Sequence, residues 1–327
     1  NTFVGASAGL LTTAVLGATL IGREAGGGGI ITTAANHTTG VGYQALYSLT
    51  SGAGNVAVGY QSLKTISTGT YCTAVGYEAG ELITGSLNTV IGYQAADLLA
   101  SGTSNTVVGG RAFGSADGSE TNSVVIGADA GSAIDHDDTD GNVIIGNDAA
   151  TGGDAALIGV VAIGYNAMND TGSNANTGTV AIGSSCLSTQ TSGMQNTAVG
   201  YESLAVLTTG KRNTAFGWQT LHANMNTGDN NTAVGYSSLY KYNPTNPTEG
   251  ENTALGALSG YYITTGEDNT LIGYGAAATG SQNLETGDGN TVVGHNAIVS
   301  ASGASNQTVI GQGADGQADN SVTLGND

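Results

Sequence analysis

The sequence has few charged residues, little proline and no long hydrophobic run. Charged residues make up 9% of the 327 residues, and six lysines and arginines face 25 acidic residues, for a net charge of −19. Such a chain is repelled by phosphate backbones and anionic lipid surfaces, so we expect no nucleic-acid binding. With two prolines and no Gly-X-Y period, the 55 glycines do not indicate collagen. No apolar segment reaches the length of a transmembrane helix, so we expect no membrane insertion.

Cysteine and histidine are also scarce. Cys72 and Cys186 are too few for a disulfide scaffold, and we expect both to be small buried residues, at repeat positions that other copies fill with a small side chain. The four histidines are far apart and occupy different repeat positions, so we expect no zinc or catalytic cluster. We therefore predict no catalytic, cofactor-binding or metal-binding residues and no enzymatic activity.

One pattern fills the chain: an Asn-Thr-Ala-Val-Gly-Tyr block that returns about every seventeen residues. It reads NVAVGY at 55–60, NTVIGY at 88–93 and NTAVGY at 196–201 and 231–236, and nineteen copies recur at spacings of 14 to 21 residues. A fixed short period indicates a solenoid, in which neighbouring repeats bury one another. We predict an all-β parallel β-solenoid, or β-roll, of about 18 rungs and a 17-residue repeat. It should be one continuous domain over 1–327, with irregular first rungs at 1–41 and longer inter-rung loops near 128–141, 236–251 and 274–289.

Each block has the composition of a strand that is covered on both faces. The residue before the glycine is always Val, Ile, Leu or Phe, and Thr or Val stands two residues earlier on the same face. The other face carries Asn and then a small or apolar residue, as in Asn196 and Ala198. Because neither face is charged, we expect the rung to cover one and a neighbouring chain the other, in an intertwined or side-by-side homotrimer.

The asparagine and the glycine have further structural implications. Stacked asparagines can form a ladder in which each amide bonds the next rung. The glycine either adopts a positive φ or allows another backbone to approach closely, and the sequence leaves both roles open. After it come Tyr, a polar residue, a small residue and often Leu, as in YQAL at 43–46 and YESL at 201–204. We expect an irregular or one-turn helical corner there.

These blocks resemble two kinds of known repeat. The strand block is similar to the Asn-Ser-Val-Ala-Ile-Gly repeats in the heads of trimeric autotransporter adhesins. The whole unit, seen in GYQALYSLTSGAGN at 42–55 and GYESLAVLTTGKRN at 200–213, resembles the repeats of phage tail-fibre shafts. The resemblance covers essentially the whole chain and implies three β-rolls packed together.

The resemblance also implies a function. It favours the structural shaft of a virion tail fibre that contributes to host-receptor attachment. The expected partners are two further copies of the chain, other virion or fibre proteins and a host surface glycan or protein. A bacterial cell-surface trimeric adhesin is one alternative. An ice-binding or self-assembling extracellular filament protein is another, and it would present a regular threonine array.

Two segments are candidate sites. Asp135, Asp137, Asp138 and Asp140 could supply oxygen ligands to calcium, but the run lacks the first acid and the final glutamate of an EF-hand loop, so we expect a solvated loop. The insert at 236–252 interrupts the regular repeat with exposed aromatic and polar residues that suit sugars or proteins. The alternative is that these aromatic residues pack on the shaft or between chains. The residues predicted as possible receptor contacts are Tyr240, Tyr242, Asn243, Trp218, Tyr261 and Tyr262.

Overall fold

The computed structural model describes residues 1–153, 156–172, 176–222, 227–246, 250–278 and 282–325. It is a parallel β-solenoid of about 18 turns with a repeat of about 17 residues, which confirms the predicted fold class. The chain divides into two compact units, Asn1–Ala162 and Ile163–Asp327. The single continuous domain stays a prediction, and parts of two predicted long loops, 247–249 and 279–281, lie outside the described residues.

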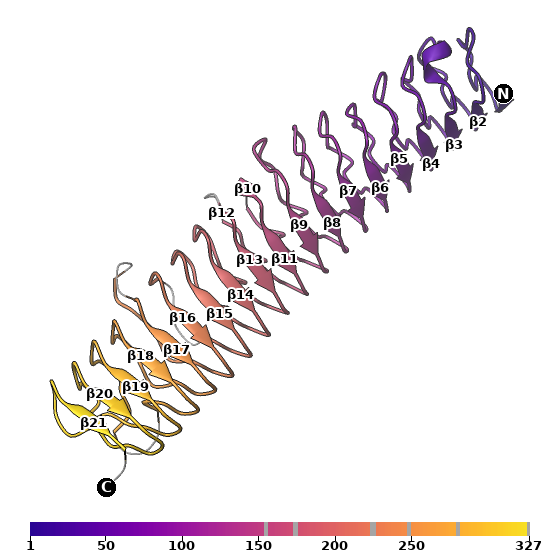
Figure 1. Ribbon diagram of the computed structural model, residues 1–327. Coiled ribbons are helices and arrows are strands. Elements are labelled where there is room, and N and C mark those ends of the chain that lie inside the picture. Colours follow the sequence, from indigo (N-terminus) through magenta and orange to yellow (C-terminus); the bar gives the residue numbers. More distant parts are fainter. Residues whose placement is uncertain (154–155, 173–175, 223–226, 247–249, 279–281, 326–327) are drawn as a thin grey trace. The chain divides into compact units, whose positions relative to one another are not determined.

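The first unit consists of short strands, one per rung in most rungs, that lie side by side (Figure 1). Among the described residues of this unit the one helical segment is a short 3-10 turn, η1. The elements are β1 Thr2–Val4, β2 Thr19–Ile21, η1 Thr33–Ala35, β3 Thr39–Val41, β4 Val56–Val58, β5 Thr73–Val75, β6 Thr89–Ile91, β7 Thr106–Val108, β8 Val124–Ile126, β9 Val143–Ile145 and β10 Leu157–Ile158, followed at the unit boundary by β11 Val161–Ile163.

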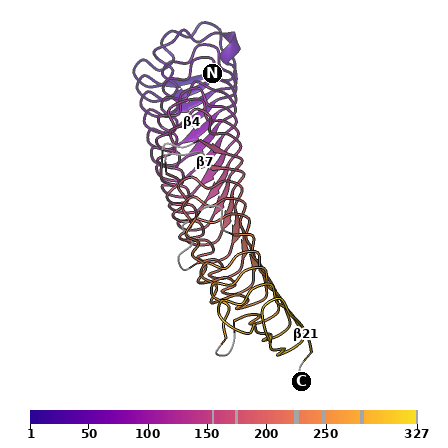
Figure 2. The ribbon, with the colours of Figure 1, turned by 90° about the vertical axis from the view of Figure 1, so that its left-hand side faces the viewer.

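The second unit repeats the same arrangement. Its strands are β12 Asn176–Thr177, β13 Val180–Ile182, β14 Thr197–Val199, β15 Thr214–Phe216, β16 Thr232–Val234, β17 Thr253–Leu255, β18 Thr270–Ile272, β19 Thr291–Val293, β20 Thr308–Ile310 and β21 Val322–Leu324. Consecutive strands from β13 to β21 pair in parallel and without a register slip. In the first unit β1 to β9 pair likewise, and Figure 2 shows their turns stacked one above another.

The middle residue of each regular strand points into its own rung. Ala198 in β14 and Val90 in β6 are completely buried, whereas the residues on either side of them are partly exposed. Successive strand residues alternate between faces, so the Thr and the pre-glycine hydrophobic residue share the outer face. The small residue three places after the glycine and the Leu that follows it also belong to the core, since Ser203 and Leu204, for example, are both fully buried.

The predicted asparagine ladder is present in both units. In the second unit the backbone N–H of Asn213 donates to Asn196 Oδ1 at 2.9 Å, and the N–H of Asn231 donates to Asn213 Oδ1 at 2.9 Å. The side-chain amides of Asn196 and Asn213 also donate to carbonyls of the next rung, Gly210 O and Gly228 O, both at 2.8 Å. These asparagines are buried, and the ladder satisfies their polar groups internally.

The glycine that closes each strand serves both roles that the sequence left open. Gly200 has φ +134°, a region almost restricted to glycine, and a Cβ there would overlap the carbonyl oxygen of Gly217 on the next rung. Gly217 stands in the same relation to Gly235. A column of glycines therefore lets the rungs approach closely at this corner.

The corner after the glycine is irregular, and the one-turn helical alternative is wrong. The second and fourth residues after the glycine are left-handed, as in Gln44 (φ 52°) and Leu46 (φ 55°), and in Glu202 (φ 52°) and Leu204 (φ 51°). Alternating left-handed residues cannot continue a right-handed helix. This conformation turns the side chain of the fourth residue into the core, since Leu46 and Leu204 are fully buried.

Both cysteines are free and buried, as predicted. Cys186 occupies the small-residue position of the corner, and burial raises the pKa of its thiol to about 12. The expectation for Cys72 was partly wrong, because it stands in the asparagine ladder. Its N–H donates to Asn55 Oδ1 at 2.9 Å, and its Sγ lies 3.3 Å from Gly85 O, where a thiol donates only weakly.

We predict that Gly200→Ala destabilises the protein far more than Gly289→Ala. Both glycines have positive φ, but a Cβ at Gly289 has no atom within 4 Å, whereas at Gly200 it meets backbone of the next rung. Gly289→Ala, the control, should lower the free energy of unfolding by about 1–2 kcal/mol, because alanine disfavours the left-handed backbone. Gly200→Ala should cost at least about 3 kcal/mol, because strain and overlap add. Urea unfolding followed by circular dichroism measures both losses, and equal losses would contradict the close-approach role.

Candidate functional site

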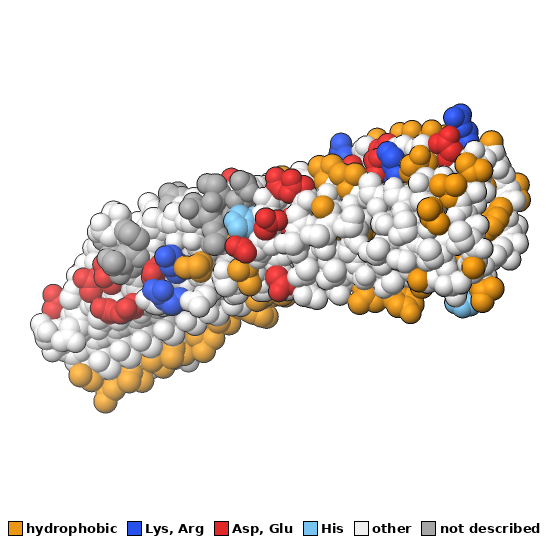
Figure 3. Space-filling view, turned by 90° about the horizontal axis from the view of Figure 1, so that it is seen from above, with side chains coloured by type: hydrophobic (Ala, Val, Ile, Leu, Met, Phe, Trp, Pro, Cys, Tyr) orange, Lys and Arg blue, Asp and Glu red, His pale blue; other side chains and the backbone are white. Residues whose placement is uncertain are grey.

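The outer face of the strands presents a hydrophobic side chain immediately before the glycine of each rung. In each unit these residues form a continuous line, which we call the outer strand row. Its more exposed members are Val4, Ile21, Val58, Val75 and Ile91 in the first unit and Ile182, Phe216, Leu255, Ile272, Ile310 and Leu324 in the second. Seen from above, a band of hydrophobic side chains without charged neighbours runs along one edge of the second unit (Figure 3). A regular apolar band of this kind is typical of an interaction surface.

A second row lies immediately after the glycines and consists of stacked aromatic rings, which we call the aromatic row. In the first unit the Tyr60 and Tyr77 ring centroids are 4.8 Å apart and nearly parallel. In the second unit Trp218 stacks on Tyr236 at 5.0 Å and on Tyr201 at 6.2 Å. The rings are still about half exposed; Tyr236, for example, retains 51% of its accessible surface. The aromatic row is therefore pre-ordered by stacking but has area left for a partner.

A row of threonines shares the outer face with the outer strand row. The strand registers place Thr197 opposite Thr214 and Thr214 opposite Thr232, and the line continues through Thr253, Thr270, Thr291 and Thr308. Thr214, Thr232 and Thr253 are exposed. From β14 to β20 the outer face is thus regular, with one threonine and one hydrophobic residue on each strand.

The six predicted receptor-contact residues fall into separate places. Trp218 belongs to the aromatic row. Tyr240 lies in another stack, 5.4 Å from His222 and 5.1 Å from Tyr261, both nearly parallel to it. Tyr262 meets the edge of Tyr261 at 4.9 Å.

These residues differ in how far they are exposed. The Lys241 ammonium lies 4.4 Å from the centre of the Tyr262 ring, so a cation covers one of its faces. Asn243 is exposed, and Tyr240 and Tyr262 are partly exposed. Tyr242 is completely buried. The expectation that it is exposed was wrong, because Tyr242 stands seven residues after Gly235, at the position where Leu49, Ile66 and Leu207 are also buried in their rungs. We call the remaining group, Tyr240, Lys241, Asn243, Tyr261 and Tyr262, the tyrosine cluster.

A polar ladder runs beside the aromatic row. Gln219 Nε2 donates to Glu202 Oε2 at 2.7 Å, and His222 Nε2 lies 3.1 Å from the same oxygen. The hydrogen bonds from Gln219 and then Tyr201 hold the pKa of Glu202 below its ordinary value. This arrangement keeps the Glu202 carboxylate ionised and hydrogen-bonded between rungs. Such a carboxylate suits a structural role rather than that of a general acid, which must carry a proton.

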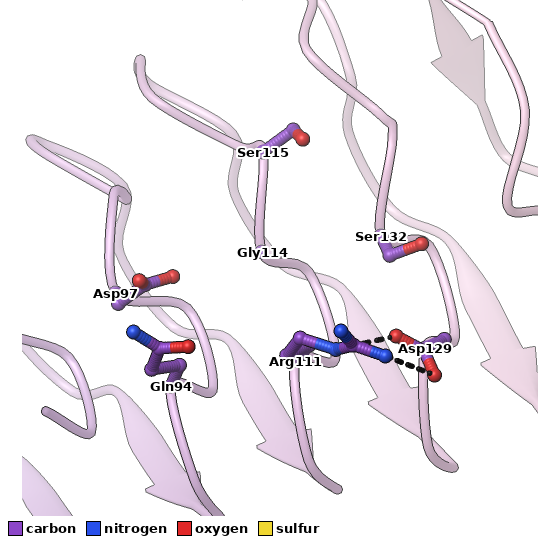
Figure 4. A pocket seen from close by; sticks show the side chains of 7 residues that line it. All are labelled: Gln94, Asp97, Arg111, Gly114, Ser115, Asp129 and Ser132. Atoms are coloured by element: carbon purple, nitrogen blue, oxygen red, sulfur yellow. Dashed lines mark hydrogen bonds and ion pairs between the residues drawn. The ribbon is translucent and has the colours of Figure 1, made fainter. Parts of the chain in front are cut away.

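A polar hollow of about 370 Å³ lies in the first unit (Figure 4). Its lining residues are Gln94, Asp97, Arg111, Gly114, Ser115, Asp129 and Ser132. Arg111 points to Asp129 on the next rung, with Nε–Oδ1 2.9 Å and Nη2–Oδ2 3.1 Å. Because this fork is already bidentate, the guanidinium does not offer a free anion site.

The predicted calcium residues are also divided. Asp140 Oδ1 accepts hydrogen bonds from Thr121 Oγ1 at 2.8 Å and from Asn122 Nδ2 at 2.9 Å, which lower the pKa of Asp140. Asp135 instead lies with Asp117 and Glu120, with one carboxylate oxygen of each within 4.8 Å of the others. Sequence reasoning missed Asp117 and Glu120. The available signal was their position about one repeat before Asp135, which places them on the adjacent rung.

The sequence matches no protein-family model, and no curated protein is similar enough to count as a relative. Among the described residues there is no helix with the length and hydrophobicity needed to cross a bilayer.

Proposed function

We propose that the chain forms the shaft of a homotrimeric fibre, in a virion tail fibre that holds a receptor-binding region away from the particle, and that it performs no catalysis. The observation that carries this proposal is the uncharged outer strand row, which continues from rung to rung in each unit. A half-exposed Val, Ile or Leu gains roughly 1 kcal/mol when a partner covers it, so many rungs together favour association. The sequence led us to expect that another chain covers one face of the strand.

Periodicity supports a further copy of this chain as the partner. The row presents one side chain per strand, at the spacing of paired strands, about 4.8 Å. Only a surface with the same repeat stays in register with it over many rungs, and the chain itself has such a surface. A closed ring of three also needs two different patches on each copy, because head-to-tail contacts are heterologous. The outer strand row and the aromatic row are two adjacent and chemically different patches.

The charge distribution fits the same proposal. The net charge of −19 resides in residues outside the outer strand row, which contains no acidic or basic residue. Chains can therefore meet along this row without burying an unpaired charge. Charge on the remaining surface keeps a hydrophobic, glycine-rich fibre in solution.

The outer face also favours a second function, an ice-binding or self-assembling extracellular filament protein. The observation that supports it is the register of the threonine row, which forms a regular array of hydroxyl and methyl groups. This function needs the outer face open to solvent, whereas the shaft needs it covered. A cell-surface trimeric adhesin would cover it in the same way as the shaft, and the gene sequence flanking residues 1–327 separates these two.

Phe216→Asp combined with Leu255→Asp tests the trimer. Wild-type protein should elute with three times the 32.1 kDa chain mass in light scattering after size-exclusion chromatography. The double variant should elute as a folded single chain, because both side chains are about half exposed in one protomer but their charges would be buried in the assembly. Trp218 emission should shift to longer wavelength with dissociation, since its ring lies in the adjacent row.

Leu98→Asp is the matched control, since Leu98 is similarly exposed but lies in the loop after β6, outside both rows. It should leave the trimer intact. A well-folded wild-type monomer would rule out the homotrimer, and thermal hysteresis of that monomer would then support the ice-binding alternative.

We propose further that host protein or glycan contacts on this segment occur at the tyrosine cluster. Stacked tyrosines with a neighbouring lysine and an exposed amide offer the apolar faces and hydrogen-bonding groups that sugar rings require. Three of its residues, Tyr240, Lys241 and Asn243, belong to the long insert, and none of the three is buried.

Tyr240→Ser combined with Tyr262→Ser should leave assembly unchanged and weaken attachment to host cells at least tenfold. Tyr71→Ser, at an exposed tyrosine outside the cluster, should leave attachment unchanged. Attachment assays with assembled protein measure this difference. Equal attachment by the double variant and wild type would remove the site and leave the segment as a spacer.

A further inference from the structure

The two adjacent rungs at 117–121 and 135–140 of the first unit bring several carboxylates together. A parallel bridge between Thr121 and Asp140 holds the rungs in register. Asp117, Asp135, His136 and Asp137 line a hollow of about 350 Å³, and this lining contains no lysine or arginine. One oxygen each of Asp117, Glu120 and Asp135 lies within 4.8 Å of the other two.

Glu120 makes this group more than a set of surface acids. Its side chain is completely buried, although Asp117 and Asp135 are exposed. Glu120 Oε2 accepts a hydrogen bond from the Gly118 N–H at 3.2 Å, but its buried Oε1 has no hydrogen-bond partner. An unpaired carboxylate oxygen out of contact with water is energetically costly.

The surroundings of Glu120 add to this cost. Burial raises the pKa of Glu120, and the negative charges of Asp137 and Asp117 raise it further. Asp137 approaches closely because residue 118 is glycine: a Cβ at Gly118 would overlap Asp137 Oδ1. The Asp137 carboxylate is held there by the Ser119 N–H, which donates to Oδ1 at 3.4 Å. The carboxylates therefore converge where repulsion between them is strong, and only a proton or a cation relieves it.

We propose that Asp117, Glu120 and Asp135, with Asp137 at the rim, bind a divalent cation of the calcium type. Calcium takes oxygen ligands at about 2.3–2.6 Å, so ligand oxygens on one ion lie up to about 5 Å apart, which matches the observed cluster. Glu120 Oε1 supplies the inner ligand, the exposed acids close the site, and water completes the coordination. The ion joins two rungs at a long loop. This site is independent of the fibre proposal.

Isothermal titration of CaCl₂ into the EDTA-treated full chain tests the site. Wild type should bind one ion per chain at this cluster, and calcium should raise its melting temperature. Glu120→Gln should weaken binding at least tenfold and abolish the thermal shift. In the absence of calcium, the same variant should melt at or above the wild-type temperature, because it removes a buried charge among like charges.

Asp138→Asn is the matched control. Asp138 is exposed on the same loop and lies outside the cluster. Its substitution by Asn removes one negative charge, as Glu120→Gln and Asp117→Asn do. Its affinity should stay within twofold of wild type. Asp117→Asn, at an exposed position that does not threaten folding, should again lose at least tenfold. Absence of saturable calcium binding by folded wild type, or equal losses in Asp117→Asn and Asp138→Asn, would overturn the proposal.

Discussion

The structure depends on hydrogen bonds that buried asparagines make between successive rungs. Asn269, for example, forms hydrogen bonds to both neighbouring rungs. Its N–H donates to Asn252 Oδ1 on the preceding rung at 3.1 Å, and its Nδ2 donates to Gly287 O on the next rung at 2.9 Å. Each asparagine therefore satisfies groups on both neighbours. A rung without its neighbours would leave several polar groups buried and unpaired, so the rungs are stable only as a stack.

The ladder explains which parts of the repeat vary and which parts do not. Between Asn231 and Asn252 the chain is longer by several residues, yet Asn252 N still donates to Asn231 Oδ1 at 3.1 Å. Candidate sites occur at such longer segments. Three residues of the tyrosine cluster lie in this insert, and Asp117, Glu120 and Asp135 lie in the long segments of two neighbouring rungs. The regular outer face, in contrast, repeats the same chemistry and suits association with a surface of equal period. Recognition and assembly are thus assigned to different parts of one rung.

The regular features could be predicted from the sequence because each depends on a local pattern that recurs. The strand positions, the asparagine ladder and the burial of Cys186 all follow from the block itself. Other features were missed where a residue of an unexpected type stands at a repeat position that is buried. Tyr242 takes the core position that Leu or Ile fills in other rungs, although the insert is polar around it, and Cys72 replaces an asparagine in the ladder. Glu120 is buried three residues before the ladder residue Ser123, at a position where other rungs have glycine, as in Gly193 and Gly210.

Residue-resolved amide hydrogen exchange of the native protein tests the ladder most directly. The N–H groups of Asn213, Asn231, Asn252, Asn269 and Asn290 each donate to the preceding asparagine side chain. They should exchange only with global unfolding and share one high protection factor, far above that of exposed loop amides. Fast exchange of these five amides at the rate of the loops would show that the asparagines do not hold the rungs together, and it would contradict the account.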